Sequence, residues 1–180
     1  MPGPQPRPAL FARLVGASWE SLPAPLREVH EAEGLVAWRG RCRVRRGEGM
    51  VARLAGRVMD LPPAGEHPDI EVVIEASRGG ETWTRCIGGA RMRSWLRESR
   101  GKLVEAMGPC VFTFALHAAN GTIQWRLHGV RCLGLPLPRS WFRVQARESV
   151  ADSLYRFEVS AAMAGVGLLV AYDGTLDPRR

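Results

Sequence analysis

Two charged residues, Arg85 and Glu148, fall on strand faces that are otherwise apolar. Alternation places Arg85 on the same face as Trp83, and a two-residue loop at 151–152 would place Glu148 opposite Tyr155. A charge buried alone costs several kcal/mol, so each must find a partner or water. One hypothesis is that both line a polar spot inside a curled sheet; the alternative, which the sequence favours, is that both lie near a barrel rim and meet solvent. The candidate ligand-binding side chains are Arg85, Glu148, Tyr155, Tyr172, Trp38 and Trp83.

One carboxylate and one guanidinium are enough for acid–base chemistry on an anionic substrate. A cofactor-independent enzyme that uses Glu148 as acid or base and Arg85 as anion holder is therefore one hypothesis. The sequence has no nucleophile elbow, P-loop, dinucleotide loop after a strand, or H-E-x-x-H pair. We predict no catalytic residue and no cofactor, and favour a non-catalytic role while leaving enzymatic activity open.

The histidines do not predict a metal site. His117 and His128 share one face of the hairpin around Asn120-Gly121. The expected register separates them by roughly 13 Å, whereas zinc needs each imidazole nitrogen within about 2 Å. His30 lies on the apolar face of an expected helix with Leu26, which is typical of a histidine packed in a core.

The cysteines are far apart in sequence and form no C-x-x-C pair, which argues against a zinc knuckle or a redox motif. Each lies in an expected strand, where cysteine acts as a small hydrophobic residue. We expect reduced core thiols in a cytoplasmic protein at all four positions: Cys42, Cys86, Cys110 and Cys132.

Four arginines alternate with apolar residues along one strand: Arg39, Arg41, Arg43 and Arg45. Such a ladder is typical of a solvated face that resists sticking to its neighbours. The alternative role of this ladder is to bind an anionic partner, which the formal charge of +7 also suggests. Lys102 is the only lysine, and this skew towards arginine often reflects genome base composition. Nucleic-acid binding is therefore not the favoured function.

Apolar spacing predicts short helices in the first third of the chain, after Pro8 and from Pro25 to Gly34. A third helix fits Met50–Asp60. Its expected inward side comprises Met50, Val51, Leu54, Ala55 and Val58. No apolar stretch reaches the length of a membrane helix, about 20 residues, and the chain start is no secretory signal, so we expect a cytoplasmic protein.

Turn signals recur at 79–80, 88–89, 120–121 and 173–174. They predict an α+β protein, mainly antiparallel β: a curled sheet or barrel of about eight or nine strands with two or three short helices. Residues 1–8 are expected to be a flexible tail and residues 9–176 a single globular domain. The Asn120-Gly121 turn predicts the pairs Ala119–Thr122, Leu116–Trp125, Phe114–Leu127 and Phe112–Gly129.

Six short segments spread over the chain resemble a bacterial family of domains of unknown function, family 4166. They are Phe11-Ala-Arg-Leu, Leu22-Pro-Ala-Pro, Trp38-Arg-Gly-Arg, Leu61-Pro-Pro-Ala-Gly, Gly108-Pro and Gly134-Leu-Pro-Leu-Pro. The family has no established activity, so the resemblance assigns no site residues. Members resemble companions of nicotinamide-binding oxidoreductase domains, which implies an accessory role beside an oxidoreductase partner.

The favoured function is a non-catalytic binding or accessory module for a small amphipathic or apolar molecule. Curled sheets of this size enclose one ligand. The same aromatic side chains could instead fill a core without a cavity. The residues expected to line such a cavity are Trp38, Trp83, Trp125, Phe112 and Phe114.

Overall fold

Antiparallel strands form most of the protein in the computed structural model, which describes residues 9–31 and 33–177. The residues 1–8 that were expected to form a tail lie outside this range. The strands are β1 Leu35–Arg46, β2 Gly65–Ser77, β3 Gly80–Ile87, β4 Ala90–Ser99, β5 Lys102–Met107, β6 Cys110–Ala119, β7 Thr122–Cys132, β8 Leu135–Leu137, β9 Phe142–Ala151, β10 Leu154–Met163 and β11 Gly167–Asp177.

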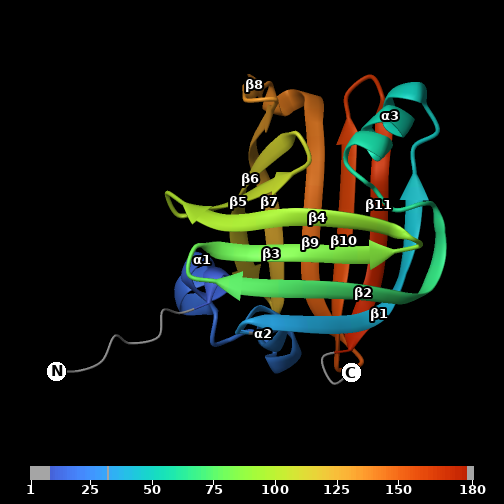
Figure 1. The fold of residues 1–180 in the computed structure, drawn as a ribbon. Helices are drawn as coiled ribbons and strands as arrows, with labels where there is room; N and C mark the ends of the chain where they lie inside the picture. The colour runs from blue at the N-terminus through green and yellow to red at the C-terminus, as the bar shows by residue number, and fades with distance from the viewer. Residues whose placement is uncertain (1–8, 32, 178–180) are drawn as a thin grey trace.

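The strands close into a barrel (Figure 1). Their order is β6-β5-β4-β3-β2-β1-β11-β10-β9-β7, and a β6–β7 pairing joins the two ends. Ten strands complete this ring, and β8 adds to the edge of β7. The mainly antiparallel β class with short helices is confirmed, with more strands than expected. Closure pairs the strand edges that an open sheet would expose.

The expected turn at Asp173-Gly174 is wrong, because both residues lie inside β11. Gly174 pairs with Cys42 of β1, and a Cβ at Gly174 would lie 2.2 Å from the Arg41 carbonyl oxygen and 2.8 Å from the Phe157 ring. This glycine therefore permits close packing between strands.

Two of the expected helices, α1 Leu10–Val15 and α2 Ala24–Glu31, lie together at one end of the barrel (Figure 1). Phe11, Leu26 and Val29 have no exposed surface. One hydrophobic cluster includes these residues and the inward side chains of the strands. The two helices therefore plug this end. Within the described residues no helix is long and apolar enough to cross a membrane.

The third helix, α3 Met50–Val58, forms as expected, but its inward side was predicted wrongly. Ala52 and Gly56 are its buried residues, whereas the larger apolar residues are exposed; Met50 is 79% exposed and Leu54 61%. Small residues let the helix approach the barrel closely, and the bulky residues then point away from that contact. Figure 1 shows α3 at the end of the barrel opposite α1 and α2.

The β6–β7 hairpin has the predicted register near its turn and a different one beyond it. The pairs Ala119–Thr122, Leu116–Trp125 and Phe114–Leu127 are confirmed. A bulge between Thr113 and Phe114 then shifts the register by one residue. Phe112 therefore pairs with Val130 and not with Gly129. A bulge places an extra residue on one strand, which alternation alone does not reveal.

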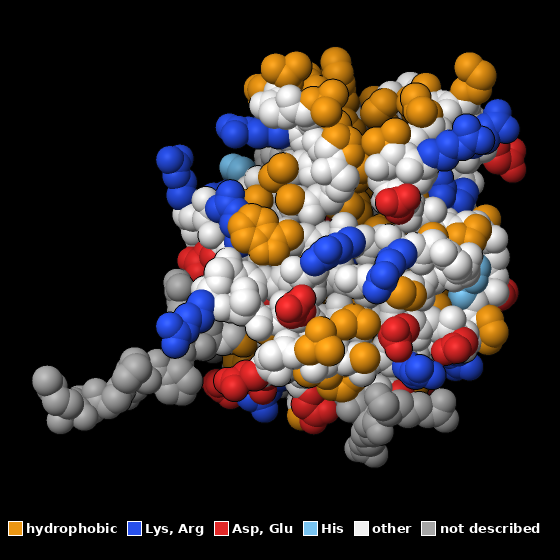
Figure 2. Space-filling model, in the orientation of Figure 1, with side chains coloured by type: hydrophobic (Ala, Val, Ile, Leu, Met, Phe, Trp, Pro, Cys, Tyr) orange, Lys and Arg blue, Asp and Glu red, His pale blue; other side chains and the backbone are white. Residues whose placement is uncertain are grey.

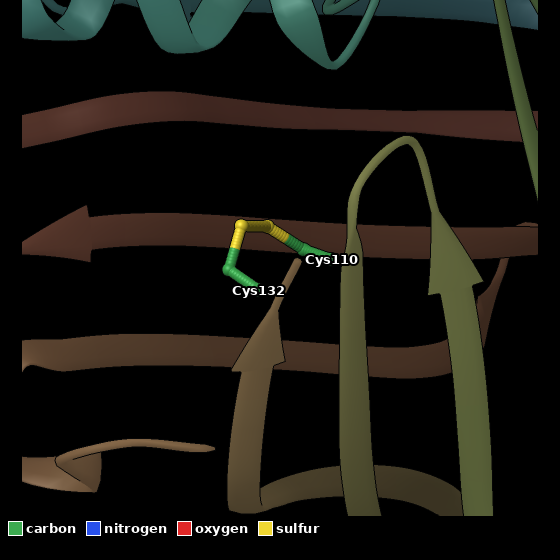
Figure 3. Close-up of a disulfide and its surroundings, with 2 residues drawn as sticks. All are labelled: Cys110 and Cys132. Atoms are coloured by element: carbon green, nitrogen blue, oxygen red, sulfur yellow. A yellow bond between two sulfur atoms is a disulfide. The ribbon is translucent and has the colours of Figure 1, made fainter. Parts of the chain in front are cut away.

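The bulge also explains why the expectation of four reduced thiols is wrong. Without it Cys110 would face Arg131, but the shifted register places Cys110 opposite Cys132. These two cysteines form a disulfide, which Figure 3 shows at the ends of β6 and β7. Cys42 is a free, buried thiol as expected, and Cys86 is free and partly buried.

The β9–β10 hairpin turns at Asp152-Ser153, where both residues have positive φ, and not at Ala151-Asp152. Glu148 consequently pairs with Phe157, and the expected pairing with Tyr155 is wrong. The shift moves the register by two residues, so Glu148 keeps its expected face.

Candidate functional site

The barrel encloses a cavity of about 390 Å³ that extends from the plugged end to a mouth beside α3. Inward side chains of the barrel strands form its wall, and Leu54 and Val58 of α3 border it. The wall is almost entirely apolar. Of the aromatic residues expected here, Trp83, Trp125, Phe112 and Phe114 line the cavity. Trp38 is buried but is not part of the lining.

A column of stacked groups connects the helical plug to the cavity. The Phe11 ring of α1 stacks on the His30 ring of α2 with centroids 3.7 Å apart. His30 in turn stacks on Trp83 of β3 at 5.6 Å. The Arg85 guanidinium carbon lies 5.0 Å from the Trp83 ring centroid, a cation–π distance. Arg85 is thereby held at the cavity wall by the tryptophan two residues before it.

Arg85 has its own polar partners inside the barrel. Its Nη1 donates to Ser94 Oγ on β4 at 2.9 Å, and its Nη2 lies 3.6 Å from Glu105 Oε1 on β5. The Arg85 and Glu105 side chains are only 12% and 11% exposed. Arg85, the positive charge expected on an otherwise apolar strand face, therefore forms an ion pair with a negative charge, Glu105, inside the barrel.

Glu148 accepts hydrogen bonds in a second polar cluster inside the barrel. His30 Nε2 lies 2.7 Å from Glu148 Oε2, and the Tyr155 hydroxyl donates a hydrogen bond to the same carboxylate. Burial raises the pKa of Tyr155 well above its usual value, the negative charge of Glu148 raises it further, and Arg85 opposes this. Tyr155 is therefore a neutral hydrogen-bond donor at ordinary pH.

Glu81, on the same face of β3 as Trp83, completes the polar groups near the plug. The Trp83 indole Nε1 donates to Glu81 Oε2 at 2.8 Å. Burial raises the pKa of Glu81, while His30 and the hydrogen bond from Trp83 lower it. The negative charge of Glu148 adds to the upward shift. Burial thus favours the protonated form of this carboxyl.

Tyr172 of β11 also lines the cavity. Burial raises the pKa of Tyr172 to about 12, with Arg85 opposing the shift and Glu105 adding to it. Both tyrosines therefore present neutral phenols rather than phenolates. They can exchange hydrogen bonds with an uncharged polar group.

The structure brings together five of the six predicted ligand-binding residues around one cavity, with Trp38 the exception. Their role in binding stays a prediction. Sequence reasoning missed Glu105 and Glu81 and did not pair His30 with Glu148. The signal for Glu105 was present, because Leu103 and Met107 flank it at alternate positions of a short strand. Glu81 similarly precedes Trp83 and Arg85 on one strand face.

The pairing of these charges limits what the cavity can do chemically. An enzyme with Arg85 as anion holder needs a free guanidinium, but Arg85 already contacts Glu105. Glu148 already accepts hydrogen bonds from His30 and Tyr155. The arrangement suits hydrogen bonding to a neutral group better than proton transfer to an anion. No three His, Cys, Asp or Glu side chains in the described ranges are arranged to hold a metal ion.

The arginine ladder of β1 faces solvent, and part of it is neutralised. Arg39 forms an ion pair with Glu71 at 3.5 Å, and Arg43 forms one with Glu66. Arg45 instead borders a groove of about 700 Å³ on the outer wall of the barrel. Arg126 of β7 and Arg147 of β9 border the same groove. Within residues 9–31 and 33–177, these three arginines form no ion pair.

Comparison with known proteins identifies a family. The family described as Domain of unknown function (DUF4166) matches residues 22–176. A protein of unknown function from the DUF3598 family of Nostoc punctiforme PCC 73102 has a similar structure, with 12% identity and a TM-score of 0.49 over 97% of this chain and 52% of that one. Rv2717c from M. tuberculosis is similar at 15% identity and a TM-score of 0.48, over 88% of this chain and 99% of that one. This chain spans about half the length of the Nostoc protein. No curated protein matches.

Proposed function

The chain belongs to the DUF4166 family, and we propose that its barrel is a non-catalytic module that binds one small, uncharged amphipathic molecule. The enclosed cavity of about 390 Å³ carries this proposal. Small-molecule sites have volumes of about 300–1,000 Å³ and combine apolar walls with a few placed polar groups. The cavity has both properties.

The size of the cavity supports a ligand rather than a packed core. Protein interiors are packed as densely as organic crystals, with few voids larger than a water molecule. A barrel of about eight strands is just wide enough for side chains to fill, and diameter grows with strand number. This barrel has ten strands in its ring. Its side chains therefore leave space around the axis.

The polar groups of the wall indicate an uncharged ligand with a hydrogen-bonding end. Arg85 is paired with Glu105, so its charge does not attract a ligand carboxylate. Glu148 would repel one. Tyr155 and Tyr172 line the cavity as neutral phenols, which can exchange hydrogen bonds with a hydroxyl or carbonyl oxygen on the ligand.

The test compares two substitutions of the same residue type on one strand. Ala161 packs inward and lines the cavity, whereas its neighbour Ala162 does not line it. Ala161→Phe places a ring in the cavity, and Ala162→Phe is the matched control. We expect an uncharged apolar fluorophore to bind the parent protein and Ala162→Phe, and to bind Ala161→Phe at least tenfold more weakly. Native mass spectrometry of gently purified protein should show a bound apolar species that Ala161→Phe lacks.

Thermal unfolding of both variants separates loss of the cavity from loss of the fold. Overpacking costs about 1–3 kcal/mol, which a folded variant can tolerate. An empty mass for the parent protein and equal fluorophore binding by both variants would contradict the proposal.

A second candidate function is binding of an anionic partner at the outer groove. Arg45, Arg126 and Arg147 come from three strands and border one groove, together with Asp173 and the Arg156–Glu158 ion pair. Guanidinium groups without carboxylate partners remain available for phosphate or carboxylate. This observation favours the groove over the β1 ladder, where Glu66 and Glu71 already occupy two arginines.

Affinity for a single-stranded oligonucleotide tests this second candidate. The double variant Arg126→Gln/Arg147→Gln should bind at least tenfold more weakly than the parent. Arg39→Gln, at an arginine already paired with Glu71, should bind as the parent does. Affinity must also fall steeply with salt. A flat salt response would exclude this function.

A further inference from the structure

Most of the large apolar side chains that the protein leaves exposed lie around the mouth of the cavity. Figure 2 shows apolar side chains along the upper edge of the molecule, over α3 and β8. We call these residues the rim patch. On α3 they are Met50, Val51, Leu54 and Val58. Across the mouth they are Leu133, Leu135 and Trp141.

Polar contacts and small residues fix the α3 half of the rim patch. Arg46 at the end of β1 donates to the carbonyl oxygens of Leu61 and Pro62, both at 3.0 Å, and of Ala52 at 3.4 Å. Ala52 is fully buried, and Gly56 leaves room for the Arg46 guanidinium. The face with small residues is thereby held against the barrel. The bulky face of α3 is left over the mouth and in solvent.

Backbone hydrogen bonds hold the other half of the rim patch, which comprises Leu133, Leu135 and Trp141. The Leu133 N–H donates to the Pro109 carbonyl oxygen at 2.9 Å, and the disulfide closes the hairpin next to it. The Ala164 N–H donates to the Trp141 carbonyl oxygen at 2.7 Å, which connects this segment to the β10–β11 turn. Both halves are therefore anchored to the barrel, with the cavity opening between them.

Positive charges outnumber negative charges around the rim patch. The segments 47–62, 107–110, 131–143 and 163–169 surround the mouth. Their acidic residues are Glu48 and Asp60. Their arginines, all exposed, are Arg53, Arg57, Arg131, Arg139 and Arg143. Exposed apolar side chains flanked by arginines are the combination by which proteins bind the interface of an anionic bilayer.

We propose that the rim patch docks on an anionic phospholipid bilayer and turns the cavity mouth towards the acyl chains. A bilayer suits the patch better than a protein partner because the patch is divided by the opening of an apolar cavity. Apolar side chains on both sides can enter the interface while an apolar molecule passes between them without crossing water. The docking depends on the rim residues alone, whereas its use for loading the cavity rests on the proposed function.

Sedimentation with vesicles tests the docking. The parent protein should pellet with vesicles of phosphatidylglycerol and phosphatidylcholine, and at least tenfold less with phosphatidylcholine alone. Raising the salt concentration should release it. Leu54→Ser/Leu133→Ser should lower the partition coefficient at least tenfold, because burying each leucine contributes roughly a factor of ten. Leu35→Ser is the matched control, since Leu35 is 71% exposed at the plugged end and should not affect binding.

The cavity variant separates this proposal from the proposed function. Ala161→Phe should pellet with anionic vesicles as the parent does while failing to take an apolar fluorophore from them. Three outcomes would overturn the docking: no binding to either vesicle, full binding by Leu54→Ser/Leu133→Ser, or a dimer in solution that this double variant abolishes. The last outcome would show that a second copy of the chain covers the patch.

Discussion

His30 and Glu148 are 118 residues apart in sequence, yet His30 Nε2 lies 2.7 Å from Glu148 Oε2 inside the protein. Their side chains are 0% and 5% exposed. The contact joins helix α2 of the plug to strand β9 of the barrel wall. It gives a buried carboxylate a donor and simultaneously positions the ring that stacks on Trp83.

Removal of the Glu148 carboxylate should therefore weaken the fold. Glu148→Ala leaves His30 and Tyr155 without their buried acceptor and should lower the free energy of unfolding by about 3 kcal/mol. Glu148→Gln keeps an acceptor and should lose about 1 kcal/mol. Urea denaturation measures both. Glu158→Ala removes a half-exposed carboxylate paired with Arg156 and should change stability by less than about 1 kcal/mol. Equal losses for Glu148→Ala and Glu158→Ala would contradict the assignment.

The Arg85–Glu105 pair should show strong energetic coupling. Arg85→Met leaves Glu105 buried without its cation and should cost about 3–5 kcal/mol. Replacing both partners removes that uncompensated charge, so Arg85→Met/Glu105→Leu should be more stable than Arg85→Met alone. A double-mutant cycle in urea measures the coupling. Additive losses would show that the two charges do not interact.

Alkaline titration should detect the burial of the two tyrosines, which are all that the chain contains. Burial raises the pKa of Tyr172 to about 12 and that of Tyr155 well above its usual value. The folded state therefore keeps protons that the unfolded chain loses near pH 10, so stability is retained below pH 10 and falls above it. Absorbance of the phenolate should rise only above pH 11 in the folded protein. A step near pH 10 that Tyr172→Phe removes would disprove the shift.

Thiol counting should confirm the Cys110–Cys132 bond. The chain has four cysteines, and Cys42 and Cys86 are free. Protein unfolded without reductant should expose two thiols, and reduced protein four. Burial raises the pKa of Cys42 to about 11, with Asp173 and Glu66 adding to the shift, so Cys42 should not react in the folded state at pH 8.

The same bond should stabilise the fold. Cys110→Ser opens a loop between residues 22 apart in sequence, which corresponds to about 3 kcal/mol of chain entropy. Thermal unfolding with and without reductant measures this loss. Four reactive thiols in the unreduced, unfolded protein would contradict the pairing.

Local rules predicted the strands and most of their faces. Alternation places Arg85 and Glu148 inward whatever the exact turn, because moving a hairpin register by two residues preserves the face. This is why the predicted polar residues surround one cavity although the Glu148–Tyr155 pairing was wrong. The bulge at Thr113 changes the register by one residue, and there the prediction failed for Phe112 and the cysteines.

The orientation of α3 shows a different limit. Its apolar face predicted burial, since most amphipathic helices cover a core. In the structure α3 instead contacts the barrel through the side that carries Ala52 and Gly56, because Arg46 holds the backbone of this segment against the barrel. Sequence periodicity identifies the two faces of a helix but not the neighbour that each face meets.

The sequence by itself determined which side chains point inward, because strand alternation is a local property of the backbone. It thereby selected Arg85 and Glu148. Only the tertiary structure decided what those charges meet. The pairing of Glu148 with His30 depends on closure of ten strands and on the plug formed by α1 and α2. Such contacts join residues far apart in sequence, and no local pattern encodes the distance between them.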